Sequence, residues 1–209
     1  MKFVSLVSSG IDSPVATYLL ADKAEEIIFV HADNRPFTDD REITNFINLA
    51  RFLHRLLPCK TKAYVVPHGL TLTSFQQQSN PRFTCVFCKR MMLRYAEAIA
   101  RKEHASAIIM GDSLGQVASQ TLQNIRVVEK AAAIPIFRPL IGFDKEDVVR
   151  IAKRIGTYDF SIVRSAGCSA VPLKPATRAR IVDVECEEQQ IDVTSLVKHA
   201  VHDMVNVPL

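Results

Sequence analysis

Three cysteines are spaced so that they could hold a metal ion or an iron-sulfur cluster. Cys85 and Cys88 form a Cys-x-x-Cys pair, and Cys168 follows much later in the segment Ser-Ala-Gly-Cys-Ser-Ala. Two thiolates separated by two residues can converge on one metal centre. Two buried core cysteines are the alternative interpretation of the pair taken alone. A structural zinc site would need a fourth ligand, and the histidines that could supply it lack a recognisable metal spacing: His31, His68 and His104.

A phosphate group could bind at residues 8–13, which read Ser-Ser-Gly-Ile-Asp-Ser. This segment lies between a predicted strand and a predicted helix. Free backbone N–H groups and the positive end of the helix dipole favour an anion at such a place. The small side chains also let the backbone approach the anion. An ordinary strand-to-helix turn capped by Ser13 is the alternative interpretation.

Alternating strands and helices are predicted to position these motifs. Runs rich in β-branched and apolar residues predict strands at 2–7, 27–32, 62–66, 107–111 and 134–138. Helical spacing of apolar residues predicts helices at 13–22, at 40–57, 86–102, 119–129, 145–155 and 189–207, with Asp144 as N-cap of the helix at 145–155. This alternation predicts an α/β fold with a mostly parallel sheet and helices on both faces. Such sheets bind ligands at the carboxyl ends of their strands.

Length and composition predict one globular domain over residues 1–209. The 209 residues are 48% hydrophobic and 23% charged and show no linker, so they can bury one sizeable core. Five cysteines, an odd number, argue against a disulfide framework. The sequence shows no signal peptide and no apolar stretch long enough to span a bilayer, so we expect a cytoplasmic protein without membrane contact. The net charge of +4 permits contact with nucleic acid without arguing for it.

Five blocks of sequence resemble one enzyme family. Residues 8–16, Ser-Ser-Gly-Ile-Asp-Ser-Pro-Val-Ala, resemble the SGGxDS signature of PP-loop ATP pyrophosphatases, and the Pro-Val-Ala extension resembles the tRNA 4-thiouridine synthetase family in particular. Four further blocks, in the family's order, lie at 31–38, 89–94, 111–120 and 138–145. One position departs from the pattern, since Ser9 stands where the family has glycine. If that position needs a positive φ, Ser9 would be strained and the affinity for ATP could suffer.

The resemblance implies an ATP site and a catalytic lysine. It assigns the ATP phosphates to the PP-loop, namely Ser8, Ser9, Gly10, Ile11, Asp12 and Ser13. It makes Asp12 essential, through a Mg²⁺ ion, and makes Lys145 catalytic. A lysine just inside a helix that follows a strand could neutralise charge on the transferring phosphates, although Lys145 taken alone would be read as part of a solvated helix face. The other positions that match the nucleotide side are His31, Ala32, Lys89, Gly111 and Gln120.

The resemblance also gives the cysteines a role. The set of Cys85, Cys88 and Cys168 is similar to that of the archaeal branch of the family, in which three cysteines hold a 4Fe-4S cluster whose open iron could carry a hydrosulfide. In bacterial members, the cysteine that matches Cys168 works in sulfur relay with a cysteine of an appended rhodanese domain, and we expect the present protein to work without one. Cys168 is therefore expected to be catalytic as well as a ligand, and zinc is the less favoured occupant. Cys59 and Cys186 are interpreted as structural.

The expected reaction is synthesis of 4-thiouridine in tRNA. ATP would adenylate the carbonyl oxygen of a uridine, and sulfide delivered through the cluster would displace AMP. The family's RNA-binding THUMP region precedes its PP-loop, which here begins at residue 8, so we expect a separate THUMP-like partner protein. The sulfur donor would be sulfide or a sulfur-carrier protein, and a homodimer is one option for assembly. The alternatives are a PP-loop enzyme acting on a small molecule or free thionucleobase, and a non-catalytic subunit that binds a nucleotide or an iron-sulfur cluster.

Overall fold

A single sheet organises the chain in the computed structural model, which describes residues 1–163 and 165–209. The strand order is β5-β4-β1-β2-β3-β6. All neighbouring strands are parallel except β6, which pairs antiparallel with β3. The strands are β1 (Lys2–Leu6), β2 (Glu26–Asp33), β3 (Lys60–Pro67), β4 (Ala107–Ile109), β5 (Ile136–Phe137) and β6 (Val205–Asn206). The predicted mostly parallel α/β fold is therefore confirmed.

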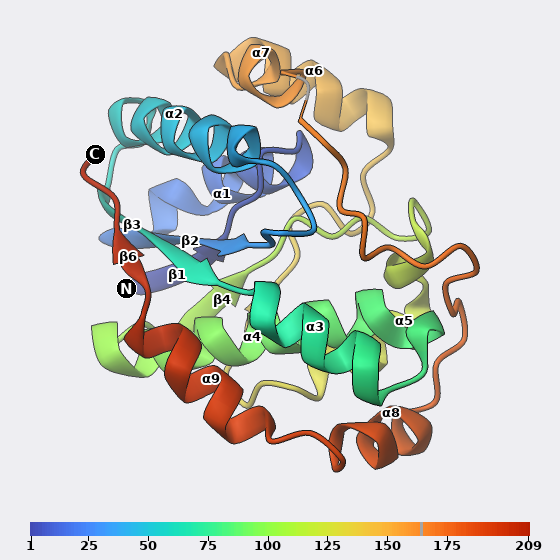
Figure 1. The fold of residues 1–209 in the computed structure, drawn as a ribbon. Helices are drawn as coiled ribbons and strands as arrows, with labels where there is room; N and C mark the ends of the chain where they lie inside the picture. Colours follow the sequence, from blue (N-terminus) through green and yellow to red (C-terminus); the bar gives the residue numbers. More distant parts are fainter. Residues whose placement is uncertain (164) are drawn as a thin grey trace.

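Helices cover both faces of this sheet, as Figure 1 shows. On one face lie α1 (Asp12–Leu20), α2 (Asp40–Leu56), α6 (Lys145–Ile155) and α7 (Tyr158–Ser161). On the other face lie α3 (Gly69–Gln78), α4 (Thr84–Glu103), α5 (Leu122–Glu129), α8 (Ile181–Glu188) and α9 (Val193–His202). Short 3-10 turns occur at Ala21–Lys23, Pro81–Phe83 and Ala118–Gln120. None of the helices in the described part of the chain is long and apolar enough to cross a membrane.

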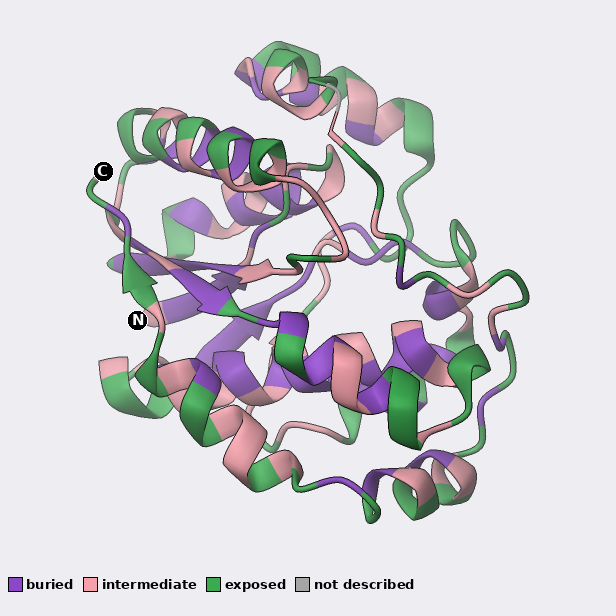
Figure 2. Ribbon diagram, in the orientation of Figure 1, coloured by how far each residue is buried: buried purple, intermediate pink, exposed green. Residues whose placement is uncertain are grey.

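The core lies in two layers, one on each face of the sheet. Side chains alternate between the layers along each strand. Phe3 of β1 packs with α1, α2 and α6, whereas the next residue, Val4, packs with α4. Ile27 and Ile28 divide in the same way in β2. Because both faces of the central strands are buried (Figure 2), these strands are continuous apolar runs in the sequence.

The structure corrects several predicted elements. The helix predicted at 189–207 is wrong at its end, because α9 stops at His202 and the chain then forms β6, which places Val205 opposite Val65 of β3. Pairing with an open sheet edge outweighs the local helical pattern there. The helix predicted from residue 119 begins at Leu122, with the Thr121 side chain accepting from the Asn124 N–H. Three helices were not predicted: α3, α7 and α8. Asp144 occupies the predicted N-cap position of α6, but its side chain forms no capping hydrogen bond with the described residues.

Candidate active site at the carboxyl ends of the strands

The loop between β1 and α1 closes on itself through its serines. The Ser8 N–H donates to Ser13 Oγ at 2.9 Å, and Ser13 Oγ donates back to the Ser8 carbonyl at 3.2 Å. The Gly10 N–H turns inward to Ser8 Oγ at 3.2 Å. Because α1 begins at Asp12, the unpaired N–H groups of its first turn belong to this loop. The predicted PP-loop thus has the strand-loop-helix geometry that suits a phosphate.

Ser9, the one departure from the family pattern, carries no backbone strain of the expected kind. Among the described non-glycine residues, a positive φ occurs at His104, the C-cap of α4, and not at Ser9. The conditional prediction of strain at Ser9 therefore does not apply. Its side chain is instead engaged, since Ser9 Oγ donates to Glu42 Oε1 at 2.7 Å.

Gly111 lies against the PP-loop more closely than any side chain would allow. It comes two residues after β4 ends at Ile109. A Cβ atom added at Gly111 would stand 2.7 Å from both the backbone nitrogen and the Cα of Ser13. The close approach of the chain after β4 to the start of α1 thus depends on glycine at this position.

Asp112 is a buried carboxylate that the sequence analysis did not single out. Its Oδ1 accepts from Lys89 Nζ at 2.5 Å and from Gln120 Nε2 at 3.4 Å, and its Oδ2 accepts from Arg138 Nε at 3.3 Å. Burial alone would raise the pKa of Asp112, but the charges of Lys89 and Arg138 outweigh it and hold this pKa below its usual value. Asp112 therefore joins two predicted site residues, Lys89 and Gln120, with Arg138, which was not predicted as a site residue. Its place directly after Gly111 at a strand end was the signal that could have identified it.

Lys145 reaches the PP-loop from another part of the chain. It is the first residue of α6, as predicted, and its Nζ lies 2.6 Å from Asp12 Oδ1. The Lys145 side chain is 47% exposed and that of Asp12 24% exposed. Ion pairs this accessible add little to stability, so the contact explains little about folding. It places a mobile cation beside the predicted phosphate site.

A cavity of about 300 Å³ lies among these elements. Most of the predicted site residues line it, namely Ser8, Gly10, Asp12, Ser13, His31, Ala32, Cys88, Lys89, Gly111 and Gln120. Asp112 and Glu42 line it as well. The predicted residues that do not line it are Ser9, Ile11, Cys85, Lys145 and Cys168. A larger cavity of about 780 Å³ lies beside α5 and contains none of the predicted residues, so its size does not make it the site.

His31 presents an unpaired nitrogen in the cavity wall. Its ring stacks on Phe46 with centroids 4.5 Å apart, and its Nδ1 lies 2.9 Å from the Val7 carbonyl. A carbonyl can only accept, so Nδ1 carries the proton. Burial lowers the pKa of His31 and keeps the ring neutral. Nε2 is then a buried acceptor without a partner among the described residues, which suits a ligand N–H or O–H group.

The three predicted cysteine ligands lie in one region as free thiols. Cys85 and Cys88 are in the first turns of α4, ahead of Lys89. Burial, together with the nearby Cys85 and Cys168, raises the pKa of Cys88 to about 12, so the three thiols are electrostatic neighbours. Within the described residues, however, no group of three or more His, Cys, Asp or Glu side chains is arranged to hold a metal ion. The predicted cluster stays a prediction.

Cys168 belongs to a segment that lies against the loop between β2 and α2. The Ser169 N–H and Oγ both donate to the Phe37 carbonyl, at 2.8 and 3.1 Å. Thr38 Oγ1 donates to the Ala166 carbonyl at 2.9 Å, and the Ala166 N–H donates to Asp39 Oδ2 at 3.3 Å. These contacts between residues 37–39 and 166–169 could not be read from the sequence. They position the backbone on both sides of Cys168.

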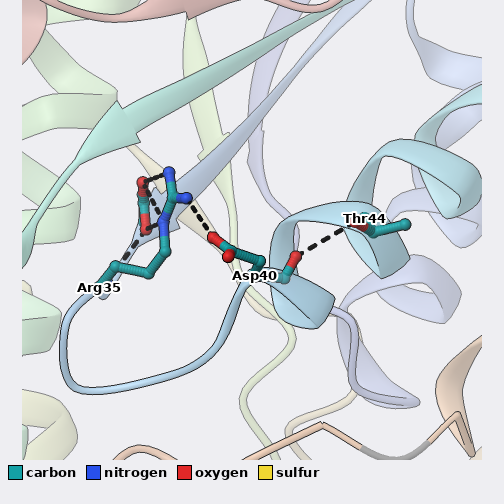
Figure 3. A network of polar contacts seen from close by, with 4 residues as sticks. Arg35, Asp40 and Thr44 are labelled. Atoms are coloured by element: carbon teal, nitrogen blue, oxygen red, sulfur yellow. Dashed lines mark hydrogen bonds and ion pairs between the residues drawn. The ribbon is translucent and has the colours of Figure 1, made fainter.

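Ion pairs of the Arg35 side chain stabilise the loop at residues 34–39 (Figure 3). The Arg35 guanidinium donates to Asp33 from Nε at 3.0 Å and from Nη2 at 2.7 Å, and it also pairs with Asp40 at the start of α2. Gly69 of α3 packs directly against the backbone of this loop, because a Cβ at Gly69 would lie 1.8 Å from the Arg35 carbonyl oxygen. The surface that holds the Cys168 segment is thus fixed at both of its ends.

A family model described as "Thiamine biosynthesis protein (ThiI)" matches residues 1–193. The chain belongs to this ThiI family. It is 40% identical over 200 residues to a Methanosarcina mazei protein and 45% identical over 177 residues to a Methanothermobacter thermautotrophicus protein, each named "Probable tRNA sulfurtransferase". These alignments cover 95% and 84% of this chain but 49% and 46% of the relatives. The chain therefore spans about half the length of these curated relatives.

A solved structure shares this fold closely. It is described as a "Crystal structure of a 4-thiouridine synthetase - RNA complex with bound ATP", and it matches with a TM-score of 0.93 and 32% identity. The match covers 99% of this chain and 55% of the other. The PP-loop fold and the family predicted from the five sequence blocks are thereby confirmed for this ThiI-family chain.

Proposed function

We propose that this chain activates a uridine of tRNA with ATP so that sulfide can replace the uridine's carbonyl oxygen, which gives 4-thiouridine. The observation that carries the proposal is the convergence of the PP-loop, Lys89, Asp112 and Cys88 on one cavity at the strand ends. The ATP and RNA in the related 4-thiouridine synthetase structure support the choice of substrates. A THUMP-like RNA-binding module would be needed in addition to the described residues to position the tRNA.

The activating step would use the PP-loop half of the cavity. Backbone N–H groups at the start of α1 would bind ATP phosphates. The uridine carbonyl oxygen attacks the α-phosphorus, the bond to the β-phosphate oxygen breaks, and pyrophosphate leaves. Lys145, beside Asp12, and Lys89, held by Asp112, would neutralise the charge that develops on the leaving phosphates. A Mg²⁺ ion on the Asp12 carboxylate would supply further charge neutralisation.

The sulfur step would exchange one bond for another at the activated carbon. The sulfide forms the new carbon–sulfur bond, and the carbon–oxygen bond to AMP breaks, so the original base oxygen leaves on AMP. Cys85, Cys88 and Cys168 would hold a 4Fe-4S cluster, which when bound supplies the sulfide. The donors fit this group in kind, because the three cysteines are free thiols and thiolates are the usual ligands of iron-sulfur clusters, with Cys85 and Cys88 at the Cys-x-x-Cys spacing.

An anaerobic assay tests this proposal. The protein is incubated with ATP, sulfide and either bulk tRNA or free bases, and both AMP and the thiolated nucleoside are measured. We expect AMP and 4-thiouridine to form together with tRNA. If a small molecule turns over while tRNA gains no sulfur, the tRNA assignment is wrong. If neither substrate releases AMP while ATP still binds, even after a THUMP-like RNA-binding protein is added, the chain is a non-catalytic subunit.

Metal analysis tests the cysteine part separately. We expect iron and acid-labile sulfide after anaerobic purification, and loss of both in a Cys168→Ala variant. Cys186→Ala is the matched control, because Cys186 lies exposed on α8 and outside the predicted ligand set. Zinc in place of iron would remove the cluster from the proposal and leave the ATP-dependent step intact.

A further inference from the structure

One carboxylate links the ATP loop to the segment that carries Cys168. Ser9 Oγ donates to Glu42 Oε1 at 2.7 Å, and Ser165 Oγ donates to Glu42 Oε2 at 2.9 Å. A carboxylate can only accept, so both hydroxyls point their protons at Glu42. The three residues come from the PP-loop, from α2 and from the stretch that follows α7. We call this arrangement the Ser9–Glu42–Ser165 bridge.

Glu42 is well placed to hold both hydroxyls. It lies in the first turn of α2, where the helix dipole favours a negative charge. It also lines the cavity beside the PP-loop residues. Each of its oxygens receives one short hydrogen bond to a charged acceptor, the stronger class of hydrogen bond. The bridge is only partly buried, so it can respond to a ligand that enters the cavity.

The bridge completes the attachment of the Cys168 segment. On one side, Ala166 and Ser169 are bonded to residues 37–39. On the other side, Ser165 is bonded to Glu42 and through it to the PP-loop. Cys168 lies between Ala166 and Ser169, and Ser165 precedes it by three residues. The bridge thus connects Ser9 of the PP-loop to the start of the segment that carries the cysteine.

We propose that Ser9 is a positioning residue that couples ATP binding to the placement of Cys168. Glycine, which the family signature has at this position, offers no hydroxyl and cannot make the bridge. In this chain, phosphates bound at the PP-loop order Ser9, and Ser9 orders the Cys168 segment through Glu42 and Ser165. The binding of ATP and the role of Cys168 in sulfur delivery rest on the proposed function; the hydrogen-bonded bridge does not.

Amide hydrogen exchange, read by mass spectrometry over residues 165–171, tests the coupling without tRNA or sulfide. In Ser9→Ala, the loss of a hydrogen bond to a charged group is expected to speed exchange in this segment about tenfold. Ser9→Thr keeps a hydroxyl and is expected to restore slow exchange. Ser74→Ala is the matched control, because the Ser74 hydroxyl on α3 donates to the Leu70 carbonyl and does not bond to Glu42.

An ATP analogue with a methylene group between the α- and β-phosphates tests the direction of the coupling. In the wild type, we expect the analogue to slow exchange in both the PP-loop and residues 165–171. In Ser9→Ala, it is expected to slow exchange in the PP-loop alone. Thermal unfolding of each variant identifies any general loss of structure.

Three results would overturn the proposal. These are unchanged exchange of residues 165–171 in Ser9→Ala, an equal effect of Ser74→Ala, and full protection of the segment by the analogue in Ser9→Ala. The outcome is separable from the proposed function. Altered exchange without thiolation of tRNA keeps the coupling and removes the function, whereas thiolation with unaltered exchange does the reverse.

Discussion

The two halves of the candidate site are held in place by different physical means. The ATP half lies at the ends of buried, parallel strands, where Gly111 touches the PP-loop backbone and Asp112 is enclosed by cations. Cys168 lies in the stretch between α7 and α8, whose described residues form no helix or strand. Hydrogen bonds to residues 37–39 and to Glu42 hold it there. The ATP half is therefore fixed by packing, and the Cys168 segment by bonds worth about 1 kcal/mol each.

The largest expected effect is on chemistry in the ATP half. Lys145→Ala should lower the rate of AMP formation at saturating ATP about 10³-fold, because it removes a cation from the developing phosphate charge. The variant should unfold at an unchanged temperature, since the Lys145–Asp12 pair is largely accessible. Arg150→Ala, on an exposed position of the same helix, is the control and should keep full activity. Equal losses in both variants would contradict the role of Lys145.

Removal of the buried carboxylate should cost the most stability. Asp112→Asn leaves Lys89 without its counter-ion and Arg138 with the exposed Glu129 alone, and it should lower the free energy of unfolding by about 3 kcal/mol at neutral pH. Urea denaturation measures this change. Asp183→Asn, which opens an exposed ion pair with Arg180, should have no measurable effect.

The pH dependence of the same variant checks the cause. The pKa of Asp112 is lowered in the folded state, so its stabilising contribution is present above the unfolded value of about 3.9 and is lost as the pH falls through the folded value. The stability difference between wild type and Asp112→Asn should be constant from about pH 5 to pH 8 and shrink below about pH 4. A difference that instead shrinks between pH 8 and pH 5 would contradict this assignment.

A smaller loss of stability is expected when a side chain is added at Gly111, next to the PP-loop. Gly111→Ala should lower the free energy of unfolding by about 2 kcal/mol, because its Cβ would overlap the Ser13 backbone. The same displacement of the PP-loop should weaken ATP binding about tenfold, measured by calorimetry. Gly142→Ala, where a Cβ meets nothing within 4 Å, is the control. Unchanged ATP affinity in Gly111→Ala would show that the PP-loop tolerates this contact.

The smallest effect should come from the Cys168 half. Thr38→Val removes one hydrogen bond to the Ala166 carbonyl and should change the global free energy of unfolding by less than about 1 kcal/mol. It should still speed amide exchange at Ala166 and Ser169, because the segment opens locally. Thr38→Ser keeps the hydroxyl and should behave as wild type. A large global loss in Thr38→Val would mean that the two halves are equally rigid.

The ATP half was largely predictable from sequence because its features are local. A strand, a turn of small residues and a helix follow one another at residues 2–22. Because the strand is buried on both faces, it appears in the sequence as a continuous apolar run. Lys145 was placed correctly at the start of α6. Asp112 escaped notice because a single aspartate after a glycine has no distinctive spacing, and its partners come from three other parts of the chain.

The Cys168 half depends on contacts that no local pattern encodes. In the sequence, Glu42 is a residue in the first turn of a helix and Ser165 is a serine in a loop. The hydrogen bond between them exists only in the folded chain. The C-terminal error has a similar origin, since Val205 fits the helical pattern but finds the open edge of β3. Helix α3 was missed because two of its four buried residues are Gly69 and Thr71, so apolar side chains do not mark its buried face at helical spacing.

The central claim is that the uridine carbonyl oxygen is adenylated in this cavity and leaves on AMP. The most direct test uses tRNA whose uridine carbonyl oxygens carry ¹⁸O, incubated with the protein, ATP and sulfide. Mass spectrometry of the AMP measures where the label goes. We predict one ¹⁸O atom in AMP for each 4-thiouridine formed. Formation of 4-thiouridine with unlabelled AMP would contradict the account.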